Sequence, residues 1–187
     1  TASVATTDFN VSSFILSSGE EYDANSLDSI WISDKYASKN GYALNDKMTL
    51  KYGEISITGT IKGMVKSSEY LICVPDENQL MPDYKTYGYV YISPAMYKSA
   101  LGGFEFYPEI HVISSLSKKE FSEAANEKLE KTNLILTKDE VISYAEAQGE
   151  ASEGKTMAST IPVIFLGIAI LIMATTMQRL TINEKTQ

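Results

Sequence analysis

The sequence has one cysteine and one histidine among 187 residues. The lone Cys73 excludes an intrachain disulfide, and its apolar neighbours predict a small buried side chain rather than a reactive thiol. The lone His111 leaves no second imidazole for a transition-metal site, so we expect a half-exposed structural histidine, no metal and no cofactor. The sequence also lacks a GxxxxGK[ST] phosphate loop and a nucleophile elbow. We therefore expect no ATP hydrolysis by this chain itself, no catalytic residues and no enzyme activity.

Basic residues are fewer than acidic ones, 16 against 24, and the formal net charge is −8. An acidic surface repels phosphate backbones, so nucleic acid is not an expected partner. One acidic loop, residues 76–78 with Asp83, offers oxygen ligands for calcium. Its spacing does not match the regular calcium loop, which favours a solvated acidic loop instead.

Charge is missing altogether from residues 158–177, which are mostly aliphatic. Twenty helical residues at about 1.5 Å each span roughly 30 Å, the hydrocarbon thickness of a bilayer. We therefore predict one transmembrane helix and contact with membrane lipid. Arg179 and Lys185 lie in the flank that follows this segment, whereas the flank that precedes it has Lys155 as its one basic residue. Basic flanks favour the cytoplasm, so we expect an extracytoplasmic N-terminal domain and a cytoplasmic C-terminus at the cell membrane.

Before the apolar segment, short strand and helix patterns alternate. The fold class they predict is α+β, with a mixed, largely antiparallel sheet and short helices. Ser33 and Ser93 are suitable N-caps for two short helices, and Gly41 suits a left-handed C-terminal cap. The strands are expected at residues 9–16, 29–32, 48–52, 55–65, 70–74, 87–92, 109–113 and 133–136.

Two capping boxes precede the membrane segment. Residues 117–120 open a helix that is expected to end near Lys131, and residues 137–140 open a second one. Val141, Tyr144 and Gln148 fall on one face of the second helix, which has no strong terminator before the membrane. We therefore expect a stalk helix that runs into the transmembrane helix.

The expected organisation has four parts: an extracytoplasmic domain at 1–137, a stalk helix at 138–157, the transmembrane helix at 158–177 and a cytoplasmic segment at 178–187. The chain begins with Thr1 rather than Met, so we expect it to be part of a longer protein. A loop near residues 102–108 carries Phe104, Phe106 and Tyr107. These aromatics either fill the core or form a contact with an extracytoplasmic protein or peptide.

Several segments together resemble the extracytoplasmic domain of MacB/FtsX-like ABC transporter permeases. They are residues 30–41 (IWISDKYASKNG), 44–50 (LNDKMTL), 57–61 (ITGTI) and 173–187 (MATTMQRLTINEKTQ), and the resemblance covers roughly 29–187. One departure is Asn45, where the family usually has glycine before Asp46; asparagine can also adopt the left-handed turn conformation.

The resemblance implies a permease subunit that pairs with a cytoplasmic ATP-binding subunit. In this family the outer domain transmits the ATPase cycle, through helices continuous with the membrane helices, to substrates or partners outside. Substrate classes across the family include peptides, lipoproteins and the regulation of cell-wall hydrolases. A single-pass receptor or anchored binding domain is the alternative, and a cell-surface adhesin is a third.

Overall fold

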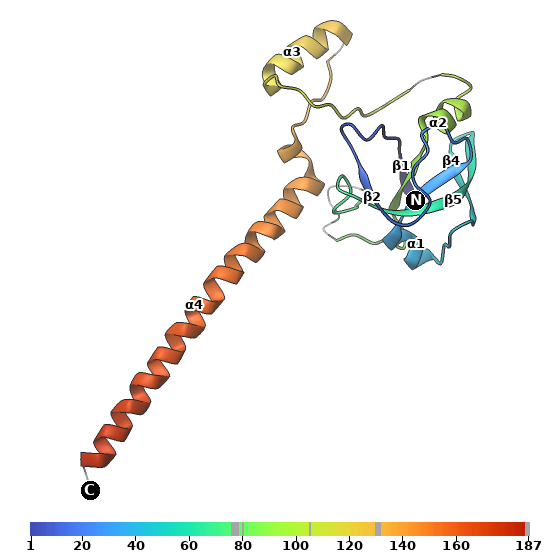
Figure 1. Cartoon of the computed structure of the whole chain (residues 1–187). Helices are drawn as coiled ribbons and strands as arrows, with labels where there is room; N and C mark the ends of the chain where they lie inside the picture. Colours follow the sequence, from blue (N-terminus) through green and yellow to red (C-terminus); the bar gives the residue numbers. More distant parts are fainter. Residues whose placement is uncertain (76–78, 80, 105, 130–131, 186–187) are drawn as a thin grey trace. The chain divides into compact units, whose positions relative to one another are not determined.

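The structure, a computed structural model, describes residues 1–75, 79, 81–104, 106–129 and 132–185. It divides the chain into two compact units, Thr1–Ala145 and Glu146–Gln187. The predicted class is confirmed: a mixed sheet with short helices is followed by a long apolar helix (Figure 1). The strands are β1 (Ala2–Ala5), β2 (Phe14–Gly19), β3 (Ser29–Ser33), β4 (Lys47–Tyr52), β5 (Ile55–Ser67) and β6 (Gly88–Ile92). The helices are α1 (Asp34–Asn40), α2 (Pro94–Ala100), α3 (Lys118–Leu129) and α4 (Ile142–Lys185), with a 3-10 turn η1 (Lys138–Glu140).

The six strands form one sheet in the order β1-β6-β3-β5-β2, and β4 also pairs with β5. The β2–β5, β4–β5 and β3–β6 pairs are antiparallel, whereas β1–β6 and β3–β5 are parallel. The long strand β5 organises this arrangement, because its first half pairs with β4 and its second half with β2.

The core lies on both faces of β3 and β6, whose residues are all buried. Successive side chains of a strand point to opposite faces, so each of these two strands contributes to two apolar clusters. One cluster receives Ala37 from α1 and Met96 from α2, while the other contains the aromatic residues of the two strands. The strand residues are Ile30, Ile32, Val90 and Ile92 in the first cluster and Trp31, Tyr89 and Tyr91 in the second.

The predicted caps and turns are confirmed. Ser33 accepts a hydrogen bond from the Tyr36 amide at the start of α1, and Gly41 ends that helix with φ 73°. Ser93 caps α2, with Pro94 in its first turn. Asn45 adopts the left-handed conformation, with φ 70°.

Three predicted strands are wrong, because residues 70–74, 109–113 and 133–136 pair with no strand among the described residues. Extended, alternating sequence makes a strand only where a second strand supplies the ladder. In the first segment the Ile72 amide instead donates to the Ser143 hydroxyl. The strand expected at 9–16 is β2, which starts at Phe14, and β1 was not predicted.

The two capping boxes have different outcomes. Ser117 and Glu120 bond reciprocally and open α3, whose predicted end near Lys131 lies outside the described residues. The box at Thr137 opens only η1, because Val141 is extended with ψ 117°. The stalk helix therefore begins at Ile142 rather than at 138.

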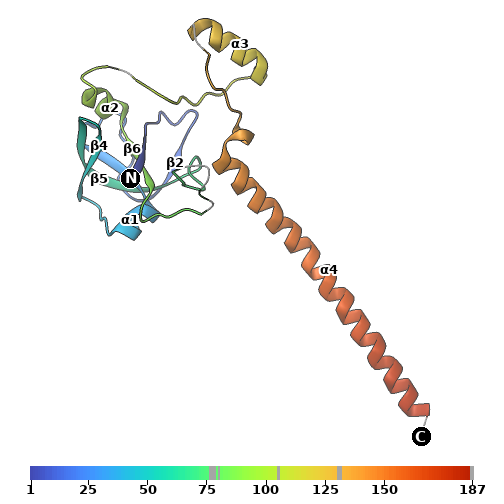
Figure 2. The same cartoon turned by 180° about the vertical axis from the view of Figure 1, so that it is seen from behind.

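Helix α4 is one uninterrupted coil of 44 residues (Figure 2). It is long and apolar enough to cross a membrane, and its most apolar 18-residue stretch is not buried at all within the protein. A helix that is apolar on all sides and covered by no protein is typical of a membrane span.

Candidate functional site

The predicted contact residues lie just after α2. Gly102 and Gly103 have φ of 64° and 87°, which turn the chain out of the helix. Phe104 and Phe106 are then 68% and 57% exposed, so most of their surface lies outside the core. Tyr107 is the most enclosed of the three, because its ring lies 5.4 Å from that of Tyr97 in α2. The exposure fits a contact surface, and the partner stays a prediction.

Apolar exposure continues beyond these aromatics. In residues 109–113 and 133–136, which were expected to be strands, most aliphatic side chains are exposed to solvent. The most exposed are Ile110, Val112, Ile113, Leu134 and Leu136. Exposed apolar side chains therefore occur before and after α3 in the sequence.

Two of the predicted stalk residues, Tyr144 and Gln148, are four residues apart in α4 and so lie on one face of the helix. Val141 precedes α4 with an extended backbone, and Gln148 is exposed. Tyr144 is half-buried, and the Lys138 ammonium lies 4.0 Å from the centre of its ring. This cation–π contact places η1 against the first turn of α4.

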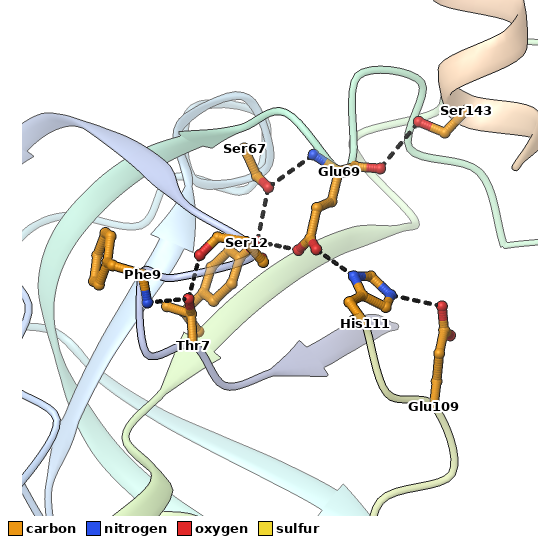
Figure 3. A network of polar contacts seen from close by, with 9 residues as sticks. Thr7, Phe9, Ser12, Ser67, Glu69, Glu109, His111 and Ser143 are labelled. Atoms are coloured by element: carbon orange, nitrogen blue, oxygen red, sulfur yellow. Dashed lines mark hydrogen bonds and ion pairs between the residues drawn. The ribbon is translucent and has the colours of Figure 1, made fainter. Parts of the chain in front are cut away.

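The start of α4 is anchored to the α+β unit by Ser143. Its hydroxyl accepts a hydrogen bond from the Ile72 amide at 3.2 Å. It donates one to the Glu69 carbonyl oxygen at 3.1 Å (Figure 3). A hydroxyl can donate once and accept twice, so it can satisfy both backbone groups. The segment that follows β5 is thereby bonded to the first turn of the long helix.

Glu69 is the centre of a polar network, because its amide, carbonyl and carboxylate all have partners. Its amide donates to the Ser67 hydroxyl at 3.2 Å. Its carboxylate accepts from the Tyr91 hydroxyl at 3.0 Å, and that hydroxyl also contacts Ser67 at 2.7 Å. Figure 3 shows the Glu69 carboxylate directed toward His111 and the carbonyl toward Ser143. One residue therefore links β5, β6, α4 and the segment of His111.

His111 lies between two carboxylates. Its Nδ1 is 2.5 Å from Glu69 and its Nε2 is 2.8 Å from Glu109. The hydrogen bond to Glu69 is the main cause that raises the pKa of His111 to about 9, and the bond to Glu109 adds to it. Burial acts to raise the pKa of Glu69, but the bond from His111 and other hydrogen bonds outweigh it, so the net pKa is lowered. At neutral pH the ring is charged and donates from both nitrogens.

This arrangement is suited to holding elements together rather than to catalysis. Both imidazole nitrogens are occupied by carboxylates, so neither is available to take a proton from a nucleophile. Among the described residues, no group of three or more His, Cys, Asp or Glu side chains is placed to hold a metal ion. The acidic loop at 76–78 lies outside the described residues. Cys73 is buried, as predicted, and burial raises the pKa of its thiol to about 11.

A shallow pocket of about 150 Å³ lies beside this network, on the side of α1. Several of its polar groups already have partners within the protein: Asp34 pairs with Lys66 at 3.5 Å, and Ser67 bonds to Tyr91. A ligand near these groups would have to displace the contacts.

Comparison of the chain with protein-family models, curated proteins and solved structures finds no match. The site must therefore be judged on its own geometry. Sequence reasoning missed both Glu69 and Ser143. Glu69 and His111 are 42 positions apart, so no local pattern could reveal their contact.

Proposed function

We propose that the chain is the extracytoplasmic domain and following membrane helix of an ABC transporter permease of the MacB/FtsX-like kind. In this role it couples a cytoplasmic ATP-binding subunit to export or to mechanical signalling outside the membrane. One observation carries the proposal: the helix that Ser143 anchors to the α+β unit continues without interruption into the apolar segment.

A continuous helix is a suitable transmission element. The 44 residues of α4 extend about 66 Å at 1.5 Å per residue. About 30 Å of this length is the uncharged stretch at 158–177, and the part that precedes it reaches Ser143. Packed helices move as units between discrete states, so a displacement at the membrane would reach the anchor at Glu69 and Ile72.

The proposed orientation follows from charge. Arg179 and Lys185 come after the apolar stretch, and basic flanks favour the cytoplasmic side. The acidic α+β unit is then outside, where the exposed Phe104 and Phe106 could meet a protein or peptide.

The second candidate is a single-pass receptor or anchored binding domain. The exposed aromatic residues at 104–107 favour it, because a binding domain needs an accessible apolar surface and no ATPase. The two candidates differ in whether ATP hydrolysis accompanies the protein.

Copurification tests the proposal directly. The full-length protein, extracted from its native membrane in mild detergent, is expected to bring with it an ATP-binding subunit and measurable ATPase activity. Recovery of the protein without an ATPase, while its α+β unit is folded, would contradict the permease and favour the receptor.

Labelling in intact cells tests the orientation. A cysteine replacing the exposed Lys85 should react with a membrane-impermeant maleimide. A cysteine replacing Thr181 should react only after permeabilisation. The native Cys73 is buried, so the unsubstituted protein is the background control. The reverse labelling pattern would overturn the proposed orientation.

A further inference from the structure

We propose that Glu69 and His111 form a pH-sensitive latch that holds the segment of residues 106–116 to the anchor of α4. The geometry is a cluster of groups from separate elements. Glu69 follows β5, Tyr91 lies in β6, Ser143 lies in α4, and His111 belongs to the segment that carries the exposed aromatics. Opening this contact would free the segment and alter the support of the helix at the same residue.

The contact of His111 is well placed to hold its segment. On either side of it, Ile110 and Val112 are 71% and 54% exposed and contribute little packing. The hydrogen bond to Glu69 reaches another element, whereas the bond to Glu109 stays within the segment. Near its beginning the segment is also attached to α2, where the Tyr97 hydroxyl donates to the Phe106 carbonyl oxygen and the Tyr97 ring lies 5.4 Å from that of Tyr107.

Deprotonation would break this arrangement for a simple chemical reason. A charged imidazole has two N–H donors, whereas a neutral imidazole has one. Two carboxylates face the ring, Glu69 from the segment after β5 and Glu109 from the ring's own segment. The tyrosines near Glu69, Tyr70 and Tyr91, remain neutral because burial raises the pKa of each. Loss of the proton therefore removes one of the two bonds and the positive charge that compensates both carboxylates, so the contact with Glu69 is weakened.

The sign of the pH dependence follows from the raised pKa of His111. The stabilisation is fully present below about pH 6.5, the ordinary value, and is lost as the pH rises through about 9. The lowered pKa of Glu69 acts at the other end. Its contribution is present above the ordinary value of 4.5 and is lost as the pH falls through the lowered one. The latch is thus closed between about pH 4.5 and pH 6.5, and it opens as the pH rises through about 9.

The consequence for function rests on the proposed role of α4 in transmission. Glu69 contacts His111 through its side chain and Ser143 through its carbonyl oxygen. A partner that binds Phe104 and Phe106 and pulls their segment would act on the same residue that supports the helix. The latch would thereby link partner binding outside to the state of the helix.

The test uses the whole chain, isotopically labelled, in lipid nanodiscs. The chain has one histidine, so its imidazole carbon signal needs no assignment. NMR would follow this signal and the Ile72 amide nitrogen from pH 5.5 to 10.5, in the wild type and in Glu69→Gln. The glutamine keeps the backbone carbonyl that Ser143 contacts, but it removes the negative charge and one of the two acceptor oxygens that His111 and Tyr91 contact. Glu109→Gln is the matched control, because Glu109 is 81% exposed and does not contact the anchor.

We expect His111 and the Ile72 amide to titrate together in the wild type, with a midpoint near 9. Glu69→Gln should move the His111 midpoint toward 6.5, remove the transition of Ile72, and speed exchange of that amide about tenfold at pH 6.5. Glu109→Gln should lower the His111 midpoint by less and leave the exchange of Ile72 nearly unchanged.

A wild-type midpoint near 6.5 would overturn the proposal, as would an Ile72 signal that ignores the titration. Fluorescence of the buried Trp31 reports whether each variant is folded. If Glu69→Gln is unfolded, His111→Gln replaces it, and unchanged Ile72 exchange in that variant at pH 6.5 also overturns the latch. None of these readouts depends on an ATPase, so the latch and the permease function can fail separately.

Discussion

Replacement of Gly149 by proline tests whether α4 transmits motion. Gly149 is the eighth residue of the helix, and its amide belongs in a bond to the Ala145 carbonyl. Proline removes that bond, and its ring clashes with the same carbonyl, at a cost of about 3 kcal/mol or more. Since 1.4 kcal/mol corresponds to a factor of ten, the continuous helix should become about a hundredfold less populated at this turn.

The substitution should act on the helix alone. A side chain built on Gly149 meets no atom within 4 Å, so no packing is disturbed. The same fact makes Gly149→Ala a matched control at the same position. Alanine favours the helix by up to about 1 kcal/mol over glycine, so the two variants change helix stability in opposite directions.

Two measurements decide the outcome. Hydrogen exchange of amides 146–153 in nanodiscs should be about a hundredfold faster in Gly149→Pro and no faster than wild type in Gly149→Ala. Trp31 fluorescence should be unchanged in both. In cells that carry the full-length protein, the proline variant should lose the outside function while ATP hydrolysis continues. If exchange shows a broken helix and the outside function is normal, α4 is not the transmission element and the domain is a passive binding module.

Three further substitutions test the fold and the surface. Gly63→Ala would place a methyl group 2.4 Å from Cδ1 of Trp31, so urea unfolding should show a loss of about 1–3 kcal/mol; wild-type stability would refute this packing. Phe104→Ser should leave the unfolding curve unchanged, because the ring is 68% exposed, but should weaken capture of an outside partner; unchanged capture would argue against the contact surface. Ser143→Ala removes both anchoring bonds, which contribute about 1 kcal/mol each, so exchange of the Ile72 amide should accelerate clearly while the sheet keeps its protection. Equal exchange rates would show that the anchor lies elsewhere.

Local chemistry explains which parts of the fold could be predicted from sequence. A capping serine, a glycine after a helix and an asparagine in a turn act on backbone groups within a few residues. Ser33, Gly41 and Asn45 therefore have the predicted roles. The apolar stretch at 158–177 is equally local, because its length and composition alone make it suitable for a bilayer.

Pairing between distant segments explains the errors. β1 pairs in parallel with β6, whose residues lie 86 positions later in the sequence. A strand of only four residues has no sequence pattern that indicates such a distant partner. Conversely, 109–113 and 133–136 have strand-like alternation but no partner strand in the described part of the chain. The Glu69 network could not be predicted for the same reason, because its residues are far apart in the sequence and come together only when the sheet folds.

The start of α4 depends on both local hydrogen bonds and contacts with residues far away in the sequence. The sequence places a capping box at Thr137 and Glu140, and that box forms, but it closes only a three-residue turn. Val141 then takes an extended backbone, and its carbonyl accepts the first bonds of α4 from Tyr144 and Ala145.

Valine has no side-chain oxygen with which to cap the next amides, so only its backbone groups bond at this point. Two residues later, Ser143 bonds to Glu69 and Ile72 instead of capping its own helix. If α4 transmits a force as proposed, Ser143 would pass it to the segment after β5, beside the contact that Lys138 of η1 makes with Tyr144. Glu69 also holds His111, so the support of the helix, through the Glu69 carbonyl oxygen, and the hold on the aromatic segment, through the Glu69 carboxylate, depend on the same residue.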